Sequence, residues 1–424
     1  MSRPLHLANR ILDAVADLSR DGLGVTREAY GPGEEAAMRA IEGFAAELGL
    51  AAERDRFQNL WLRLPEDARL EPPVVIGSHL DSVPQGGNFD GLAGVVAGLL
   101  VLDRLRGRAG LAPPLRVLAL RGEESAWYGK AYTGSLALVG RLPASALALP
   151  HRAGRGTLGE AMARSGVDVD AVSRGEALLR PHEIAAYLEL HIEQGPVMIA
   201  RGWPSAVVTG IRGNIRRHRI RCVGEAGHSG AVPRWLRKDA LLAVAELLSS
   251  MDEHWRVLLQ MGVDLVMTAG ICTTSVQSHA VSVIPGEVTF SFEIRSQDSD
   301  TLARFDQLFQ EACRGIAASR GVSFDFDAAL TSAPAAMDAG WIARLEAAGA
   351  ARGAPVERVP SGAGHDAAVF AGSGVPAAMV FVRNANGSHN PHEAMDTADL
   401  LDGVDLLLTA LTGAAAKDVS GLAA

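Results

Sequence analysis

The chain has 424 residues, more than one hydrophobic core usually supports, so we expect two domains. Its formal net charge of −9 gives no electrostatic reason to expect nucleic-acid binding, which needs a clustered basic surface. The three cysteines are widely spaced and odd in number, which argues against a disulfide framework or a thiolate zinc site and favours a reducing cytoplasm. No apolar stretch is long enough to span a bilayer, so we expect no membrane partner.

Strand-like and helix-like segments alternate along most of the chain, which predicts an α/β domain with a mostly parallel sheet. A short continuous apolar run at 73–76 is typical of a strand buried on both sides. The strand at 187–192 alternates, so that Glu189 and His191 share one face. In chain order, the predicted elements are helices at 1–18 and 35–48, a strand at 73–76, a helix at 91–105, strands at 115–120, 187–192 and 377–382, and a helix at 400–411.

The pattern changes at about Ala206. Residues 207–223 and 287–295 alternate like strands exposed on one face, and helical patterns at 238–251 and 302–318 accompany them. Two helices on one face of an antiparallel sheet predict a smaller inserted α+β domain. We therefore expect a discontinuous main domain of residues 1–206 and 329–424, with an inserted domain of residues 207–328.

Side chains that can bind metal ions follow four of the predicted strands. Ligands of an open α/β sheet bind beyond the carboxyl ends of its strands, so we expect these side chains to meet at one edge. Alone, each has an ordinary explanation: Asp90 suits a helix N-cap, and His191 suits a hydrogen-bonded strand residue. Together they predict a metal cluster. Its candidates are His79 and Asp81 after the first strand, Asp90 at the start of the next helix, Glu123 and Glu124 after the second strand, His191 in the third and His389 beyond the fourth.

This mixture of residue types suits a pair of divalent metal ions. Two such ions roughly 3.5–4 Å apart need a bridging carboxylate, further imidazole and carboxylate ligands, and a shared water molecule. Imidazole and oxygen ligands without thiolate favour zinc, with manganese and cobalt as alternatives. One carboxylate must stay uncoordinated, to take the proton of the water and return it to the leaving amine. The adjacent Glu123 and Glu124 could divide these roles.

Four motifs carry a resemblance to a known family. They are Gly77-Ser-His-Leu-Asp-Ser-Val-Pro84 with Gly86-Gly-Asn-Phe-Asp-Gly91, Glu189-Leu-His-Ile-Glu-Gln-Gly195, Ser361-Gly-Ala-Gly-His-Asp-Ala367, and Ser388-His-Asn-Pro391 with Glu393. Through most of its length the sequence resembles the hydantoinase/carbamoylase branch of the metal-dependent aminoacylase and carboxypeptidase superfamily. That branch includes N-carbamoyl-L-amino-acid hydrolases, β-ureidopropionases, and allantoate and ureidoglycolate amidohydrolases.

The resemblance implies roles for individual residues. Asp90 would bridge two metal ions, Glu123 would be the general base and then the general acid, and His228 would help to stabilise the tetrahedral oxyanion. Arg295 would bind the substrate carboxylate, for which a guanidinium group is suited. The other implied metal ligands are His79, Glu124, His191 and His389; Gln194 would contact the substrate; Asp81, which would orient His79, would support the site together with His365 and Asp366.

Departures from the usual family residues fall in the inserted domain. Ser282 stands where the family usually has Asn before Val-Ile-Pro-Gly, and His279 stands where it usually has the Asn of Pro-Asn-Ala. Ala231-Val232 replaces the Thr-Thr that usually follows the histidine of this domain. We expect Ser282 to contact the substrate, in a pocket that differs from those of the best-known members because a hydroxyl is shorter than an amide.

The resemblance implies a hydrolase that cleaves the C–N bond of an N-carbamoyl (ureido) amino acid and gives the amino acid, ammonia and carbon dioxide. Allantoate or ureidoglycolate hydrolysis stays open, as does a dipeptidase or aminoacylase on the same metal core. A non-catalytic relative would have lost the base or a ligand, and neither is lost. The resemblance also implies two divalent ions per subunit, a small carboxylate-bearing substrate, and an inserted domain that acts as a lid and forms a homodimer.

Overall fold

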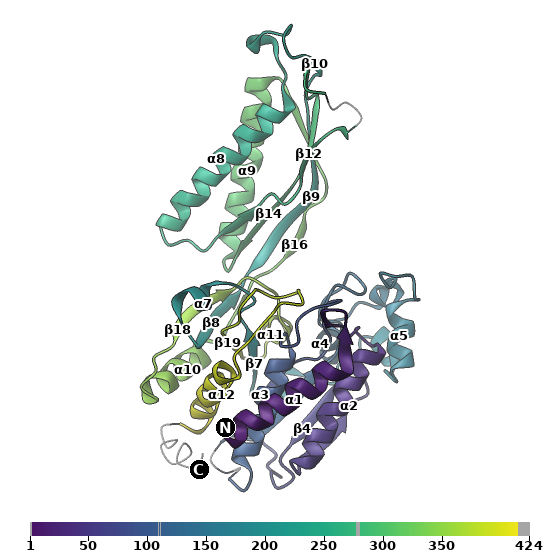
Figure 1. Ribbon diagram of the computed structural model, residues 1–424, viewed down its shortest axis with the longest axis vertical. Coiled ribbons are helices and arrows are strands. Elements are labelled where there is room, and N and C mark those ends of the chain that lie inside the picture. Colours follow the sequence, from purple (N-terminus) through teal and green to yellow (C-terminus); the bar gives the residue numbers. More distant parts are fainter. Residues whose placement is uncertain (1, 109, 111, 277–279, 414–424) are drawn as a thin grey trace. The chain divides into compact units, whose positions relative to one another are not determined.

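The computed structural model describes residues 2–413 apart from residues 109, 111 and 277–279. The chain forms two compact units: a larger one of residues 1–209 and 336–424, and a smaller one of residues 210–335 (Figure 1). The smaller unit extends to Ala335, beyond the expected domain end at 328. The reason is that β16 (Leu330–Ser332) pairs with β9 (Gly213–Val223) inside that unit.

The larger unit is built on a nine-stranded sheet in the order β17-β8-β19-β7-β5-β6-β4-β3, with β18 also paired to β8. Its strands are β3 (Ala51–Arg54), β4 (Leu60–Arg63), β5 (Val74–His79), β6 (Leu115–Leu120), β7 (Ala186–Ile192), β8 (Ser205–Ile211), β17 (Ala335–Ala336), β18 (Glu357–Ser361) and β19 (Ala377–Val382). The central strands β19, β7, β5 and β6 are parallel, whereas β8 and β4 pair with them antiparallel. The predicted α/β fold is confirmed; its sheet is mixed, with parallel strands at the centre and antiparallel strands on both sides of them.

Helices pack on both faces of this sheet. The helices of the unit are α1 (Arg3–Ser19), α2 (Pro32–Glu47), α3 (Leu92–Leu105), α4 (Thr133–Leu138), α5 (Leu158–Arg164), α6 (Val169–Ser173), α7 (Val197–Arg201), α10 (Ala339–Ala351), α11 (Asp366–Ala371) and α12 (Thr397–Thr412), with short 3-10 turns η2 (Ala144–Ala148) and η3 (Pro181–Glu183) and a small hairpin of β1 (Arg20–Asp21) and β2 (Gly24–Val25). On one face α3 and α12 pack together, and Leu190 of β7 lies against Gly403 of α12. On the other face Phe370 of α11 stacks on Tyr187 of β7, with ring centroids 3.9 Å apart. Because Tyr187 and Leu190 are three residues apart, they point to opposite faces, and β7 is buried on both sides.

The smaller unit is an antiparallel sheet with two helices, α8 (Ala240–Gln260) and α9 (Ser299–Arg320). Its main sheet has the order β11-β14-β9-β15, with β12 paired to β14 and β16 to β9. The further strands are β10 (Gly227–His228), β11 (Val266–Thr268), β12 (Cys272–Thr274), β13 (Val283–Ile284), β14 (Glu287–Ser296) and β15 (Ser323–Phe326), with a 3-10 turn η4 (Arg234–Leu236). This agrees with the α+β architecture predicted for the insertion.

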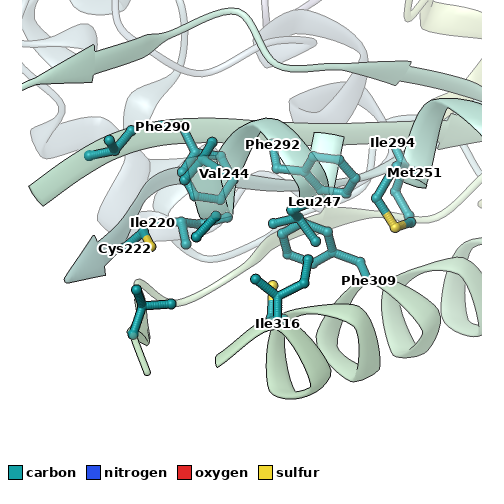
Figure 2. Packing of buried hydrophobic residues seen from close by; sticks show 14 of the residues in the cluster. Ile220, Cys222, Val244, Leu247, Met251, Phe290, Phe292, Ile294, Phe309 and Ile316 are labelled. Atoms are coloured by element: carbon teal, nitrogen blue, oxygen red, sulfur yellow. The ribbon is translucent and has the colours of Figure 1, made fainter. Parts of the chain in front are cut away.

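Alternating residues of β14 form the core of the smaller unit, on the face that the two helices cover (Figure 2). Phe290 and Phe292 are fully buried there, and Phe292 stacks on Phe309 of α9 with ring centroids 4.0 Å apart. Helix α8 continues past its predicted end at Met251. The prediction stopped too early because most of the later residues are exposed and give little apolar periodicity. None of the helices in the described part of the chain is both long and apolar enough to cross a membrane.

Candidate metal centre

Five metal-capable side chains meet at the carboxyl ends of the parallel strands of the larger unit. His79 ends β5, Asp90 lies two residues before α3, Glu124 follows β6, His191 lies in β7, and His389 lies in the loop after β19. All are buried except His389. The parallel arrangement brings together residues that are up to 310 positions apart in the sequence, as the strand-end argument predicted.

Asp90 lies between two groups of ligand atoms. Its Oδ1 is 3.3 Å from Nε2 of His79 and 3.1 Å from Nε2 of His191. Its Oδ2 is 3.4 Å from Nε2 of His389, and that nitrogen is 3.3 Å from Oε1 of Glu124. Each carboxylate oxygen of Asp90 therefore faces a different group, as a carboxylate that bridges two metal ions must.

These separations fit metal ligands. Two atoms bound about 2.0–2.1 Å from the same zinc ion, at the tetrahedral angle, lie about 3.3 Å from each other. The four nitrogen–oxygen distances of 3.1 to 3.4 Å match that value. The residues present thus fit two divalent ions: His79, Asp90 and His191 would hold one, and Asp90, Glu124 and His389 the other.

The second ring nitrogens of two histidines have backbone partners. Nδ1 of His191 lies 2.9 Å from the carbonyl oxygen of Ile192, and Nδ1 of His79 lies 3.1 Å from that of Asp81. A proton on Nδ1 that donates to these carbonyls leaves Nε2 free to bind a metal ion. Asp81 was expected to orient His79, and here its backbone oxygen is the hydrogen-bond partner, with its carboxylate Oδ1 at 3.4 Å.

The Asp81 carboxylate has a further role that the sequence did not suggest. Its two oxygens each accept a hydrogen bond of 3.0 Å, from the backbone N–H groups of Glu123 and Glu124. Asp81 therefore fixes the loop after β6 against the end of β5. Glu123 itself belongs to neither ligand group: it is buried, and its Oε2 lies 4.0 Å from Nε2 of His79. It is close to the centre and outside both groups.

Backbone conformations around the centre are unusual. Gln194 and His389 both have a positive φ, 63° and 59°, a backbone conformation that residues other than glycine adopt uncommonly. In this conformation the Gln194 Nε2 group donates to Oδ2 of Asp90 at 2.7 Å. Gly91 has a φ of 67°, and a Cβ there would lie 2.5 Å from the His79 ring, so only glycine can follow Asp90.

Comparisons with known proteins agree with this geometry. Residues 75–413 match the family described as Peptidase family M20/M25/M40. The chain belongs to this family. It is 33% identical to an N-carbamoyl-L-amino acid amidohydrolase from Geobacillus stearothermophilus, over 91% of this chain and 92% of that protein. It is 32% identical to an allantoate amidohydrolase from Escherichia coli strain K12, over 91% of each.

Solved structures give the same result. A crystal structure of a hydantoinase/carbamoylase family amidase from Burkholderia multivorans aligns with a TM-score of 0.85 and 29% identity, over 98% of each chain. The predicted resemblance to that branch is confirmed. The M20 family is metal-dependent, and this member has the two groups of candidate ligands described above.

Beneath the centre of this M20 protein lies a second layer of buried polar groups. The His365 ring meets the His191 ring edge-on, with centroids 4.4 Å apart, and its Nε2 lies 2.9 Å from the Ser361 hydroxyl. Asp366 accepts a hydrogen bond from Ser135, and burial followed by the charge of Glu189 raises the pKa of Asp366 to about 7. His365 therefore lies against one candidate ligand, and the supporting roles of His365 and Asp366 stay predictions.

The electrostatics of the M20 centre favour added positive charge. Burial raises the pKa of Glu124 despite its hydrogen bond with His389, and the charge of Asp90 adds to the rise. Burial likewise raises the pKa of Glu123 despite the nearby His79. Burial alone would lower the pKa of His79, yet hydrogen bonding to Asp81 and Asp90 raises it well above its usual value. Hydrogen bonds to Asp90 and Glu124 raise the pKa of His389 to about 11. The pKa of Asp90, which the three histidines surround, is instead lowered well below its usual value against the effect of burial, so this carboxylate stays ionised. Imidazoles that attract protons around an ionised carboxylate are suited to bind cations in place of those protons.

Sequence reasoning missed Arg27. Its side chain is fully buried and donates from Nε to the carbonyl oxygen of Leu80 at 2.6 Å. A terminal nitrogen donates to Oδ1 of Asn88 at 3.0 Å. Arg27 thus joins the loop after β5 to the loop that carries Asp90. An isolated arginine 53 and 61 positions from its partners gives no local signal.

Glu393 and Ser388 also hold the centre in place. Both belong to the last of the four family motifs, and no role was predicted for either of them. Glu393 accepts hydrogen bonds from the backbone N–H groups of Phe89, at 2.9 Å, and of Asp90, at 3.2 Å. The Ser388 hydroxyl donates to Oδ2 of Asp90 at 2.7 Å and also contacts Glu393. Asp90 is therefore fixed through its backbone and its carboxylate by the loop that carries His389.

The remaining predicted residues lie in the smaller unit. His228 is exposed on β10, opposite Val283 of β13, and the backbone N–H of Ser229 donates to the carbonyl oxygen of Ser282 at 2.8 Å. Arg295 lies near the far end of β14, where it pairs with Glu293 at 3.0 Å. Eight residues of β14 separate Arg295 from Glu287 at the His228 end, roughly 25 Å of strand. This unit therefore brings Ser282 to His228 and keeps Arg295 away from both; His279 lies outside the described residues.

Proposed function

We propose that the chain is a metal-dependent amidohydrolase that cleaves the C–N bond of an N-carbamoyl amino acid or a related ureido acid. The observation that carries the proposal is Asp90, which presents one carboxylate oxygen to each of two candidate ligand groups, with Glu123 buried beside them. Relatives named for N-carbamoyl-L-amino acid and allantoate hydrolysis support the substrate class.

The proposed cofactors are two divalent ions per subunit, with zinc favoured and manganese or cobalt as alternatives. Bound there, such ions supply the positive charge that polarises a carbonyl group and makes a water molecule acidic near neutral pH. His79, Asp90, Glu124, His191 and His389 are the proposed ligands. The nitrogen–oxygen distances of 3.1 to 3.4 Å support this assignment.

Glu123 is the proposed general base and acid. It is buried and lies outside both ligand groups, so its carboxylate can accept a proton from the attacking water. It then gives that proton to the departing nitrogen as the C–N bond breaks. For an N-carbamoyl amino acid, water and substrate give the amino acid and carbamate, which falls apart to ammonia and carbon dioxide. Asp81 keeps Glu123 in place through the backbone hydrogen bond.

Substrate binding is proposed for Gln194, Arg295 and Ser282, and stabilisation of the tetrahedral oxyanion for His228. The contact of Gln194 with Asp90 supports its place at the centre. The guanidinium group of Arg295 suits a carboxylate of the substrate. We further propose that the inserted domain acts as a lid and forms a homodimer, and that the protein works in the cytoplasm, where free cysteines such as the exposed Cys272 stay reduced.

Allantoate hydrolysis is the second candidate. The chain is as similar to an allantoate amidohydrolase, at 32% identity, as to an N-carbamoyl-L-amino acid amidohydrolase, at 33%. Both substrates present a ureido group near a carboxylate, so the same centre suits either. A dipeptidase or aminoacylase with this metal core is the third candidate, and the Glu193-Gln194-Gly195 triplet argues against it.

An ammonia-release screen tests the proposal. The protein, loaded separately with zinc and with manganese, is given N-carbamoyl amino acids, allantoate, N-acetyl amino acids and dipeptides. We expect ammonia from a ureido acid, and the preferred ureido acid decides between the first two candidates. Amine release from N-acetyl amino acids or dipeptides, without activity on any ureido acid, would reject the proposal in favour of the third.

A further inference from the structure

A second site lies at the other end of the sheet from the metal centre. Here a cavity of about 590 Å³ is lined by residues of β3, β4 and β6 and by the chain around residues 69–73 and 179–184. Glu123 follows the end of β6, whereas Arg116, which lines the cavity, is the second residue of that strand. Seven residues of chain, roughly 20 Å, separate the two.

Two arginines face each other across the strands at this cavity. In the pairing of β4 with β6, Leu60 lies opposite Ala119 and Leu62 opposite Val117, so the next pair in register is Arg63 with Arg116. Like charges directly opposite on neighbouring strands destabilise a sheet. A ligand of opposite charge would offset this repulsion.

Both arginines open onto the cavity, away from α3. Val117 packs against Gly98 of α3, so Arg116, the residue before it, points to the opposite face of the sheet. Arg63 and Arg116 both line the cavity and both are only partly exposed.

Neither guanidinium group has a carboxylate partner among the residues that the structure describes. Arg116 donates to the carbonyl oxygen of Leu115 at 2.8 Å, and Arg63 donates weakly to those of Leu64 and Pro65. The nearby carboxylate of Asp67 is already held by two 2.7 Å bonds from Arg69. Burial lowers the pKa of Arg116, the charge of the nearby Asp67 carboxylate opposes this shift, and the positive charges of Arg63 and Arg69 add to it.

The other walls of the cavity define the rest of the ligand. Trp61 shares the face of β4 with Arg63, and Leu179 and Ile184 are buried apolar residues that also line the cavity. Three glutamates also line the cavity, and all are exposed, so water solvates their charges. A volume of this size is typical of sites for small molecules.

We propose that this cavity binds a small organic anion, whose carboxylate or phosphate group pairs with Arg63 and Arg116 and whose apolar body lies against Trp61. Guanidinium groups are suited to both headgroups, because they donate two parallel hydrogen bonds. The site is separate from the metal centre and does not depend on the proposed reaction.

Calorimetric titration of the full-length protein tests the proposal with four probes: benzoate, phenyl phosphate, the neutral benzamide, and inorganic phosphate. We expect benzoate or phenyl phosphate to bind, with the tighter of the two identifying the headgroup, and benzamide and inorganic phosphate to bind at least about tenfold more weakly. Equal binding of benzamide would show that the cavity recognises only the ring, and absence of binding by either aromatic anion would reject the site.

Variants separate this cavity from anion binding elsewhere in the protein. Arg116→Gln and Arg63→Gln should each weaken binding of the aromatic anion at least about tenfold. Arg116→Lys keeps the charge but loses the paired guanidinium donors, so its affinity should lie between those of the wild type and Arg116→Gln. Arg358→Gln removes the same charge from an exposed position on β18 and should leave the affinity unchanged. Both cavity variants should be at least as stable as the wild type, because each removes one of two facing charges. Wild-type affinity in both would overturn the proposal.

Discussion

The metal centre of the larger unit and the core of the smaller unit bury side chains of opposite character. At the centre, His79, Asp90, Glu124 and His191 are all less than a tenth exposed. In the core, the buried residues are aromatic and aliphatic, as on the inner face of β14. The first group loses the hydration of its charges on folding, which costs free energy unless opposite charges are near. The second gains roughly 25 cal/mol for each Å² of apolar surface buried.

The difference separates the region whose packing stabilises the fold from the region whose side chains are held in place for chemistry. The smaller unit is stabilised by its own packing, such as the stacked pair Phe292 and Phe309. The metal centre is held in place by hydrogen bonds with residues around it: Asp81 and Glu393 accept from backbone N–H groups, and the buried Arg27 donates to a backbone carbonyl. Its carboxylates are left with excess negative charge that bound cations would offset. Activity should therefore depend on single atoms at the centre, and stability on volume in the core.

The largest effect is expected from Glu123→Gln. Loss of the proposed base should lower the rate of ammonia release by about 10²–10⁴-fold, the usual contribution of general acid–base catalysis. Metal content, measured by elemental analysis, should stay at two ions per subunit, because Glu123 belongs to neither ligand group. Glu346→Gln, on the surface of α10, is the control and should keep full activity. A Glu123→Gln protein with near-normal turnover would remove Glu123 from this role.

Next comes Phe309→Ala. Removing a fully buried ring that stacks on Phe292 should lower the free energy of unfolding by about 3–5 kcal/mol in urea denaturation. Phe309→Leu keeps more of the volume and should lose less. The metal content of the folded protein should not change in either variant. If the alanine variant unfolds at the wild-type urea concentration, packing of β14 against α9 does not stabilise this unit as we argue.

Much of this comparison could be predicted from the sequence. The ends of β6 and β19 were predicted to the residue, because a short, mostly apolar run bounded by polar residues or turns marks a buried strand. Four of the candidate ligands were found because they lie at strand ends, where the topology of a parallel sheet brings residues together, and Asp90 was added from its place at the start of the next helix. These signals are local, or follow from a rule that needs no coordinates.

The rest depends on contacts that no local pattern records. Arg27 is important only because Leu80 and Asn88 fold back onto it. The carboxylate of Asp81 was expected to act on His79, and its bonds to the backbone beyond β6 appear only once β5 and β6 are paired. Likewise, the facing of Arg63 and Arg116 follows from the register of β4 on β6, which the sequence does not specify.

Removal of metal ions should produce an effect of intermediate size. If the buried carboxylates and imidazoles bind cations, chelation should lower the unfolding temperature measured by calorimetry. The loss corresponds to about 2.7–4.1 kcal/mol for ions present at 100 to 1,000 times their dissociation constant. His389→Ala, which alters one ligand group, should retain part of this stabilisation, and Asp90→Ala, which alters both, should lose it all. Equal unfolding temperatures with and without chelator would contradict the assignment.

The smallest effect is expected from Asp239→Ala in the smaller unit. Asp239 is the N-cap of α8, and its Oδ1 accepts a 3.0 Å hydrogen bond from the backbone N–H of Leu242. Without that acceptor the first turn of the helix has an unpaired donor, so the free energy of unfolding should fall by about 1 kcal/mol. Asp239→Asn keeps an acceptor at the same place and should lose only a fraction of this. Because the cap stabilises the helix and contributes nothing to the metal centre, ammonia release at 25 °C should be the same in both variants. A loss of metal content in Asp239→Ala would contradict this separation, because it would show that metal binding in the larger unit depends on the stability of the smaller unit.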